Sequence, residues 1–271
     1  IIIPSVDFFS KLLGRKNFYI ISILLFTIAS LMCGMARNLG EMVLFRILQG
    51  AGGGGILPIS QAIMMESFPK EKRGTAMAVF GMGVIIAPIV GPVLGGWITD
   101  NWSWPWIFFI NVPFGCLAAI LSQKLLFNPP YSHRQKGVKM DGLGFFFLTV
   151  WLLCLQVFFD KGNNADWFNA TWICVIFTIS CIAGLCFFVS QVVRKDTLLD
   201  LSVFKDRNFV IGTIIQVVMQ AVLYASLAIL PQFLQSMMGY TAFLSGYSMM
   251  PRGFGSMTAM IICALIADKV D

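Results

Sequence analysis

The segment from Gly74 to Ile98 contains no charged residue, and its central part reads Gly83-Val-Ile-Ile-Ala87-Pro88-Ile-Val-Gly91-Pro92-Val-Leu-Gly95-Gly96. Small residues recur at every fourth position from 83 to 95, which places them on one stripe of a helix. Such a stripe lets a neighbouring backbone come close, and helices associate in this way in lipid. Each proline removes one backbone hydrogen bond. We therefore predict a membrane helix that bends or packs tightly.

The composition of the chain is typical of a membrane protein. Hydrophobic residues make up 58% of the chain and charged residues only 12%, whereas about a quarter of the residues are charged in soluble domains. The 7 cysteines lie in apolar stretches without metal-ligand spacing, so they predict core packing, with no metal and no cofactor. Because the chain starts without Met and stops beside a charged turn, we interpret it as a fragment cut at both ends.

The apolar runs predict eight membrane spans, at about 20 residues per crossing. Fourteen of the 19 Lys and Arg residues fall on alternate connections, which the positive-inside rule places in the cytoplasm. The net charge of +6 then reflects topology and not nucleic-acid binding. The predicted spans are residues 18–36, 42–65, 74–98, 106–127, 142–160, 171–193, 209–235 and 244–267, and residues 1–6 would end an earlier helix.

Arg46 is a charged residue inside a predicted span, about two turns from its start. Gly50 and Gly54 follow it at four-residue steps, and Gln49 lies one turn away. A guanidinium beside an amide, facing a space cleared by glycine, could hold a carboxylate or order water, and intramembrane charges usually serve a function. The alternative is a structural arginine bonded to a carbonyl of a neighbouring helix.

A second set of polar residues lies near the end of the chain. Gln216, Gln220 and Tyr224 form a stripe at four-residue steps, and Arg252 lies early in the last predicted span. The stripe either lines a cavity or hydrogen-bonds to another helix, and Arg252 has the alternative of extending to the membrane interface.

Acidic residues are missing from the middle of every predicted span. All 13 of them lie in loops or at span ends, and Asp160 is the deepest. This stretch therefore offers no deep carboxylate to carry a proton. It also lacks a Ser/His/Asp or metal constellation inside the spans, which argues against an intramembrane enzyme.

Several of these motifs resemble those of the major facilitator superfamily. The run from Gly91 to Gly96, with Gly83 before it, resembles the antiporter motif on the fifth helix of its exporters, and Arg46-Ile-Leu-Gln49-Gly50 resembles the fourth-helix motif R-x-x-Q-G. The stretches 104–115 and 199–253 resemble the fourteen-helix drug:proton antiporters, the EmrB/QacA group.

The cytoplasmic gating loop of that superfamily is kept only in part. Gly14, Arg15 and Lys16 match the end of its pattern, whereas Asp7 and Lys11 depart from it. The gating charge pairs ascribed to the loop would then be reorganised.

The resemblance implies an all-α transmembrane bundle with the major facilitator fold, in three parts. Residues 1–127 would hold the tail of helix 2 and helices 3–6, residues 128–208 a cytoplasmic loop and the inserted pair 7–8, and residues 209–271 helices 9–10 of the C-terminal half. The first helix of the family, whose carboxylate is usually linked to protonation, would lie outside this stretch.

The function implied by the resemblance is proton-coupled antiport of drugs or other amphipathic molecules across the inner (plasma) membrane, with Arg46 and Gln49 in proton coupling. The expected partners are lipid, a small-molecule substrate and protons. EmrB-like members also use a periplasmic adaptor and an outer-membrane channel, QacA-like members work alone, and the sequence leaves this choice open. The alternatives are an exporter of one metabolite, such as a siderophore or a fatty acid, and, from a different class, an intramembrane enzyme or a scaffold.

Overall fold

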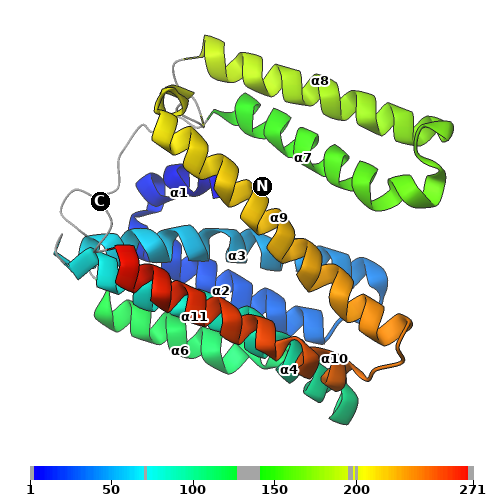
Figure 1. Cartoon of the computed structure of the whole chain (residues 1–271). Coiled ribbons are helices and arrows are strands. Elements are labelled where there is room, and N and C mark those ends of the chain that lie inside the picture. Colours follow the sequence, from blue (N-terminus) through cyan, green and yellow to red (C-terminus); the bar gives the residue numbers. More distant parts are fainter. Residues whose placement is uncertain (1–2, 70–71, 127–140, 195–197, 199–200, 268–271) are drawn as a thin grey trace. The chain divides into compact units, whose positions relative to one another are not determined.

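The computed structural model describes residues 3–69, 72–126, 141–194, 198 and 201–267, and every regular element in these ranges is helical. The helices are α1 (Val6–Leu13), α2 (Arg15–Gly34), α3 (Leu39–Ser67), α4 (Arg73–Asn101), α5 (Trp106–Phe109), α6 (Asn111–Leu125), α7 (Gly142–Gly162), α8 (Thr171–Val193), α9 (Arg207–Ser236), α10 (Ala242–Ser248) and α11 (Met250–Ala267), with 3₁₀ turns at Ile3–Ser5, Asn163–Ala165, Trp167–Asn169 and Leu201–Lys205 (Figure 1). The predicted cytoplasmic residues Lys70, Arg134, Lys136, Lys139, Lys195 and Lys269 lie outside the described ranges.

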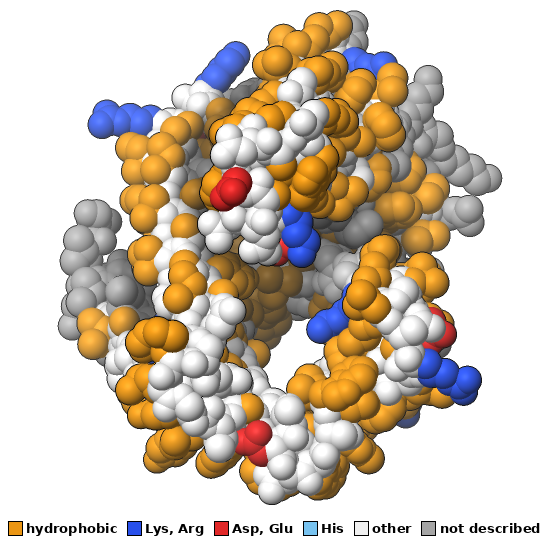
Figure 2. All heavy atoms as spheres, turned by 90° about the vertical axis from the view of Figure 1, so that its right-hand side faces the viewer, with side chains coloured by type: hydrophobic (Ala, Val, Ile, Leu, Met, Phe, Trp, Pro, Cys, Tyr) orange, Lys and Arg blue, Asp and Glu red, His pale blue; other side chains and the backbone are white. Residues whose placement is uncertain are grey.

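Seven helical segments in the described part of the chain are long and apolar enough to cross a membrane, with α5 and α6 counted together as one crossing. Figure 2 shows hydrophobic side chains over most of the visible surface of the helices, whereas Lys, Arg, Asp and Glu appear at scattered places. Apolar side chains gain by facing lipid as much as by facing each other, so this exposure is expected of membrane helices. The all-α transmembrane prediction is confirmed.

The eighth predicted span, residues 244–267, is interrupted. Helices α10 and α11 lie on either side of Met249, whose N–H donates to the Gly246 carbonyl at 3.1 Å. Pro251 accounts for the break, because a proline lacks the N–H that would bond to the carbonyl four residues earlier, here that of Tyr247. The predicted span therefore consists of two consecutive helices rather than one.

The predicted end of the first helical segment at residue 6 is also wrong, because α1 continues beyond it. Asp7 and Lys11 form an ion pair one turn apart on α1, which supports a helix by about 0.2–0.5 kcal/mol. Gly14 then ends α1 with a φ of 82°, a conformation that favours glycine. The two residues that depart from the family's loop pattern thus pair with each other.

The helix contacts divide the chain into two compact units. The first contains residues 1–18 and 127–214, and the second contains residues 19–126 and 215–271. In the first unit, α7 and α8 form an antiparallel pair (Figure 1), in which the Ser180 hydroxyl donates to the Trp151 carbonyl at 3.2 Å. The three-part division of the sequence remains a prediction.

In the second unit, glycines set the spacing of the helices around α2. A Cβ atom at Gly52 of α3 would lie 2.5 Å from the backbone nitrogen of Phe26 on α2. Another at Gly115 of α6 would meet the Thr27 hydroxyl of the same helix. Backbones can approach this closely only where no side chain intervenes. These contacts hold α2, α3 and α6 together, and these helices carry the polar residues Ser30, Gln49 and Asn111.

Candidate functional site

Helices α4 and α10 touch backbone to backbone at one end of α4. A Cβ atom at Gly96 would lie 2.5 Å from the Ala242 carbonyl oxygen, and one at Gly246 would lie 2.5 Å from the Pro92 carbonyl oxygen. The Asp100 carboxylate completes the contact by accepting the N–H of Phe243 on α10. We call this contact the α4–α10 seam.

The glycine stripe of the opening motif does not form this seam. At Gly83, Gly91 and Gly95, no described atom apart from the adjoining backbone of α4 lies within 4 Å of the place that a Cβ would occupy, and Ala87 is exposed. Within the described residues no backbone approaches this stripe, so the close approach along it stays a prediction. The contact follows the adjacent row of residues 92 and 96, which also lie one turn apart.

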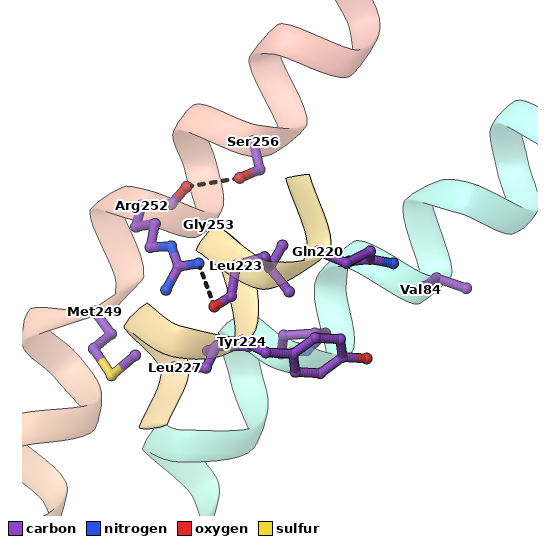
Figure 3. Close-up of a pocket in the computed structure, with 10 residues that line it drawn as sticks. Val84, Gln220, Leu223, Tyr224, Leu227, Met249, Arg252, Gly253 and Ser256 are labelled. Atoms are coloured by element: carbon purple, nitrogen blue, oxygen red, sulfur yellow. Dashed lines mark hydrogen bonds between the residues drawn. The ribbon is translucent and has the colours of Figure 1, made fainter. Parts of the chain in front are cut away.

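Further along α4, the helix borders a cavity of about 230 Å³ that α9 and α11 complete (Figure 3). We call it the Arg252 cavity. Its polar lining consists of Gln220, Tyr224, Arg252 and Ser256, and its apolar lining consists of Val84, Pro88, Leu223, Leu227 and Met249, together with Gly253. Apolar walls with a few convergent polar groups are the usual character of a ligand pocket.

The Arg252 guanidinium lies between α11 and α9. Its Nη2 donates to the Leu223 carbonyl at 3.0 Å, whereas its Nη1 is buried and has no hydrogen-bond partner among the described residues. Figure 3 shows the guanidinium turned toward α9, with Ser256 donating to the backbone carbonyl of Arg252. Buried polar groups normally find a partner, so the free Nη1 marks a place for an acceptor.

Three of the four residues predicted to line a cavity are brought together here. Gln220, Tyr224 and Arg252 share the lining, but Gln216 is exposed and does not. Gln216 lies one further turn along α9, about 6 Å away at 1.5 Å per residue. Sequence reasoning missed Ser256, although it lies four residues after Arg252 and therefore on the same side of α11.

Arg46 belongs to a separate polar cluster on α2, α3, α5 and α6. Its Nη1 donates to Gln49 Oε1 at 3.1 Å, and Gln49 Nε2 donates to the Ser30 hydroxyl at 3.0 Å. Asn111 Nδ2 donates to the same hydroxyl at 3.1 Å, and Ser30 donates to the Phe108 carbonyl at 3.0 Å. Gln49 and Ser30 are buried, so the cluster fixes Gln49 and, through it, Arg46.

The Arg46 guanidinium itself lies over an aromatic ring. Its Cζ is 4.6 Å from the centroid of the Phe108 ring, a geometry in which the ring quadrupole attracts the cation. Arg46 is exposed, and no carboxylate within the described ranges forms a salt bridge with it. A fixed, accessible guanidinium of this kind is available to an anionic group.

The comparisons with known proteins agree with the sequence resemblance. The chain is 36% identical over 272 residues to the probable multidrug resistance protein EmrY of Escherichia coli K12, covering 100% of this chain and 52% of EmrY. It is 35% identical over 270 residues to the multidrug export protein EmrB of the same organism, covering 99% of this chain and 52% of EmrB. For the fatty acid resistance protein FarB of Neisseria gonorrhoeae the identity is 36% over 272 residues, covering 99% of this chain and 53% of FarB.

The chain thus spans about half the length of the curated relatives that it matches. The family model described as Major Facilitator Superfamily matches residues 1–271, which is the whole chain. Seven membrane-length helices are present in the described ranges. On this evidence, the chain belongs to the Major Facilitator Superfamily.

Proposed function

We propose that the full-length protein containing this chain exports drugs or other amphipathic small molecules by proton-coupled antiport. The printed names of two relatives, a multidrug resistance protein and a multidrug export protein, support this proposal. Transporters of this superfamily bind substrate between two repeat units and expose it to each side of the membrane in turn. The protein then acts as a carrier that moves its substrate chemically unchanged.

The observation that carries the proposal is the double role of α4. The same helix supplies Pro92 and Gly96 to the α4–α10 seam and Val84 and Pro88 to the Arg252 cavity. Any shift of α4 against α10 and α11 therefore changes the seam and the cavity together. Such a mechanical link is what alternating access needs, because the cavity must open to one side while the other side stays closed.

The topology follows from the charge distribution. With the basic connections in the cytoplasm, α4 begins at Arg73 on the inner side of the inner membrane and reaches the seam near its outer end. The seam would then close the outer side while substrate enters the Arg252 cavity from the inside. The three parts at residues 1–127, 128–208 and 209–271 would form the first half, the inserted pair and the start of the second half.

Proton coupling is assigned to Arg46 and Gln49. The fixed guanidinium over Phe108 would stabilise the ionised form of a carboxylate on the family's first helix and so lower its proton affinity. Gly14, Arg15 and Lys16 would form the cytoplasmic gating turn. A periplasmic adaptor and an outer-membrane channel remain open as partners.

The experiment is transport by the full-length protein in proteoliposomes with an imposed pH gradient. We expect the gradient to drive several chemically unrelated fluorescent dyes across the membrane, and a protonophore to stop them. If no amphipathic compound moves in response to the gradient, the proposal fails.

A second candidate is export of one metabolite, such as a fatty acid or a siderophore. FarB is named for fatty acid resistance and is as similar to this chain as EmrY is. The same proteoliposomes separate the two functions, since gradient-driven movement of a single compound among many favours the dedicated exporter.

A further inference from the structure

Arg252 is a cation without an anionic partner in the described part of the chain. The salt bridges described there involve Asp7, Asp160 and Asp141, and none of them includes Arg252. No Asp or Glu is among the described residues that line the Arg252 cavity. A charge removed from water is costly unless an opposite charge or several hydrogen bonds compensate it. The Arg252 cavity therefore has a net positive lining.

The hydrogen bonds of the guanidinium leave room for one more acceptor. Nη2 is committed to the Leu223 carbonyl, whereas Nη1 is buried without a partner. A guanidinium presents its N–H groups as a planar fork that matches the two oxygens of a carboxylate. A rotation of the Arg252 side chain would direct this fork at a carboxylate in the cavity, and Gln220 in the same lining supplies an amide donor.

The rest of the cavity determines what is attached to that acid. Leu223, Leu227, Met249 and Val84 form an apolar wall beside the guanidinium. The volume of about 230 Å³ is below the range of roughly 300–1,000 Å³ that is common for drug-sized ligands. The space suits an acid group and the first part of an aliphatic chain better than a rigid multi-ring molecule.

We propose that the Arg252 cavity binds amphipathic monocarboxylic acids, with the carboxylate on Arg252 and the aliphatic part against Leu223, Leu227 and Met249. This inference rests on the proposed export function and names a substrate class for it. The lone guanidinium favours anions and repels cationic amphiphiles, because charge interactions beside apolar walls are stronger than in bulk water.

The first test compares two probes that differ by one negative charge and one methyl group. Dansyl-labelled undecanoic acid and its methyl ester are titrated into the full-length protein in lipid nanodiscs at alkaline pH, and the signal of empty discs is subtracted. We expect the wild-type protein to bind the acid with a Kd about tenfold or more below that of the ester, as one charge-assisted pair provides. Equal affinities for acid and ester overturn the proposal.

Variants test whether Arg252 causes the preference for the acid over the ester. Arg252→Gln should raise the Kd of the acid to near that of the ester, and Arg252→Lys should keep part of the preference because it keeps the charge. Arg37→Gln removes the same charge at an exposed position outside the cavity and serves as the matched control. Retained ester binding shows that Arg252→Gln is folded, and a preference for the acid that survives in Arg252→Gln contradicts the proposal.

The binding test and the transport test can fail separately. If the acid preference is absent while dyes still follow the pH gradient, this inference fails and the export function stands. If the acid is preferred but no compound moves, the export function fails and the cavity remains an acid-binding site.

Discussion

The Asp100 carboxylate, in the last turn of α4, accepts a hydrogen bond at 2.9 Å from the backbone nitrogen of Phe243, in the first turn of α10. The first N–H groups of a helix have no partner within the helix and favour a negative charge beside them. Thr241 satisfies a second such group, since its hydroxyl accepts the N–H of Leu244 at 3.2 Å. Asp100 thus ties the start of α10 to α4 next to the Gly96 contact.

We predict that Asp100→Ala loosens the α4–α10 seam. The substitution removes a capping acceptor, a change that costs about 1 kcal/mol and so raises the population of the open seam about fivefold. The measurement is labelling of Ser245→Cys, in a background without native cysteines, by a membrane-impermeant maleimide. Ser245 is fully buried beside the seam, so labelling should be slow before Asp100 is replaced and several-fold faster afterwards. Unchanged labelling would show that Asp100 does not hold the seam.

Replacing either of two glycines of α4 with alanine should change the stability of the protein, but in opposite directions. Gly96→Ala places a Cβ 2.5 Å from the Ala242 carbonyl oxygen, and overpacking of this kind costs about 1–3 kcal/mol. Gly91→Ala meets no described atom within 4 Å apart from the adjoining backbone of α4 and should gain up to about 1 kcal/mol from helix propensity. Thermal unfolding of the full-length protein in detergent measures both changes. The seam is misassigned if the two variants unfold at the same temperature.

The spans were predictable because bilayer thickness requires about 20 apolar residues for each crossing. The face of α4 that makes contact was not predictable from the period alone. Residues 92 and 96 are one turn apart just as residues 91 and 95 are, and only the position of Gly246 on α10 selects the first row. The break at Met249 likewise depended on how Pro251 is accommodated, since a proline is tolerated in the first turn of a new helix.

The cavity was predictable in part. The four-residue spacing of Gln220 and Tyr224 already indicates a shared face of α9. Spacing along one helix cannot show which neighbour covers that face, so the contributions of Val84 and Pro88 required the packed structure.

Arg46→Ala should abolish pH-gradient-driven efflux and leave the fold intact. Arg46 is exposed, donates one hydrogen bond to Gln49 and lies over the Phe108 ring, so its loss should lower the free energy of unfolding by about 1–3 kcal/mol. Efflux and unfolding are measured on the same preparation. Efflux of several dyes at the wild-type rate in Arg46→Ala would remove the assigned role in proton coupling.

Ser30→Ala should have its main effect on stability. The Ser30 hydroxyl is fully buried and joins Gln49, Asn111 and the Phe108 carbonyl. Its removal leaves the buried Gln49 amide and Phe108 carbonyl short of a partner, at a cost of about 1–3 kcal/mol. Ser236→Ala on α9 is the matched control, because Ser236 is exposed and bonds only within its own helix. Equal unfolding temperatures of the two variants would contradict the role given to Ser30.

Asp141→Ala should separate the open ends of the α7–α8 pair. The carboxylate of Asp141 is nearly fully buried and accepts hydrogen bonds from the Gly144 N–H at 2.9 Å, Gln191 at 3.0 Å and Arg194 at 3.3 Å. Because Arg194 is half-exposed and can return to water, we expect a loss of about 1–3 kcal/mol rather than the larger cost of stranding a buried charge. Hydrogen exchange at the first turn of α7 should accelerate by at least about fivefold.

Asp160→Ala provides the comparison for this variant. Asp160 ends the same helix and pairs with Lys161 at 3.2 Å, but both side chains are more than half exposed, and such pairs contribute only about 0–1 kcal/mol. Exchange in α7 should therefore stay close to that of the wild-type protein. If Asp160→Ala and Asp141→Ala accelerate exchange equally, the buried Asp141 carboxylate does not stabilise the contact between α7 and α8. The pair would then depend on its apolar contacts, such as the stacking of Trp151 on Phe187.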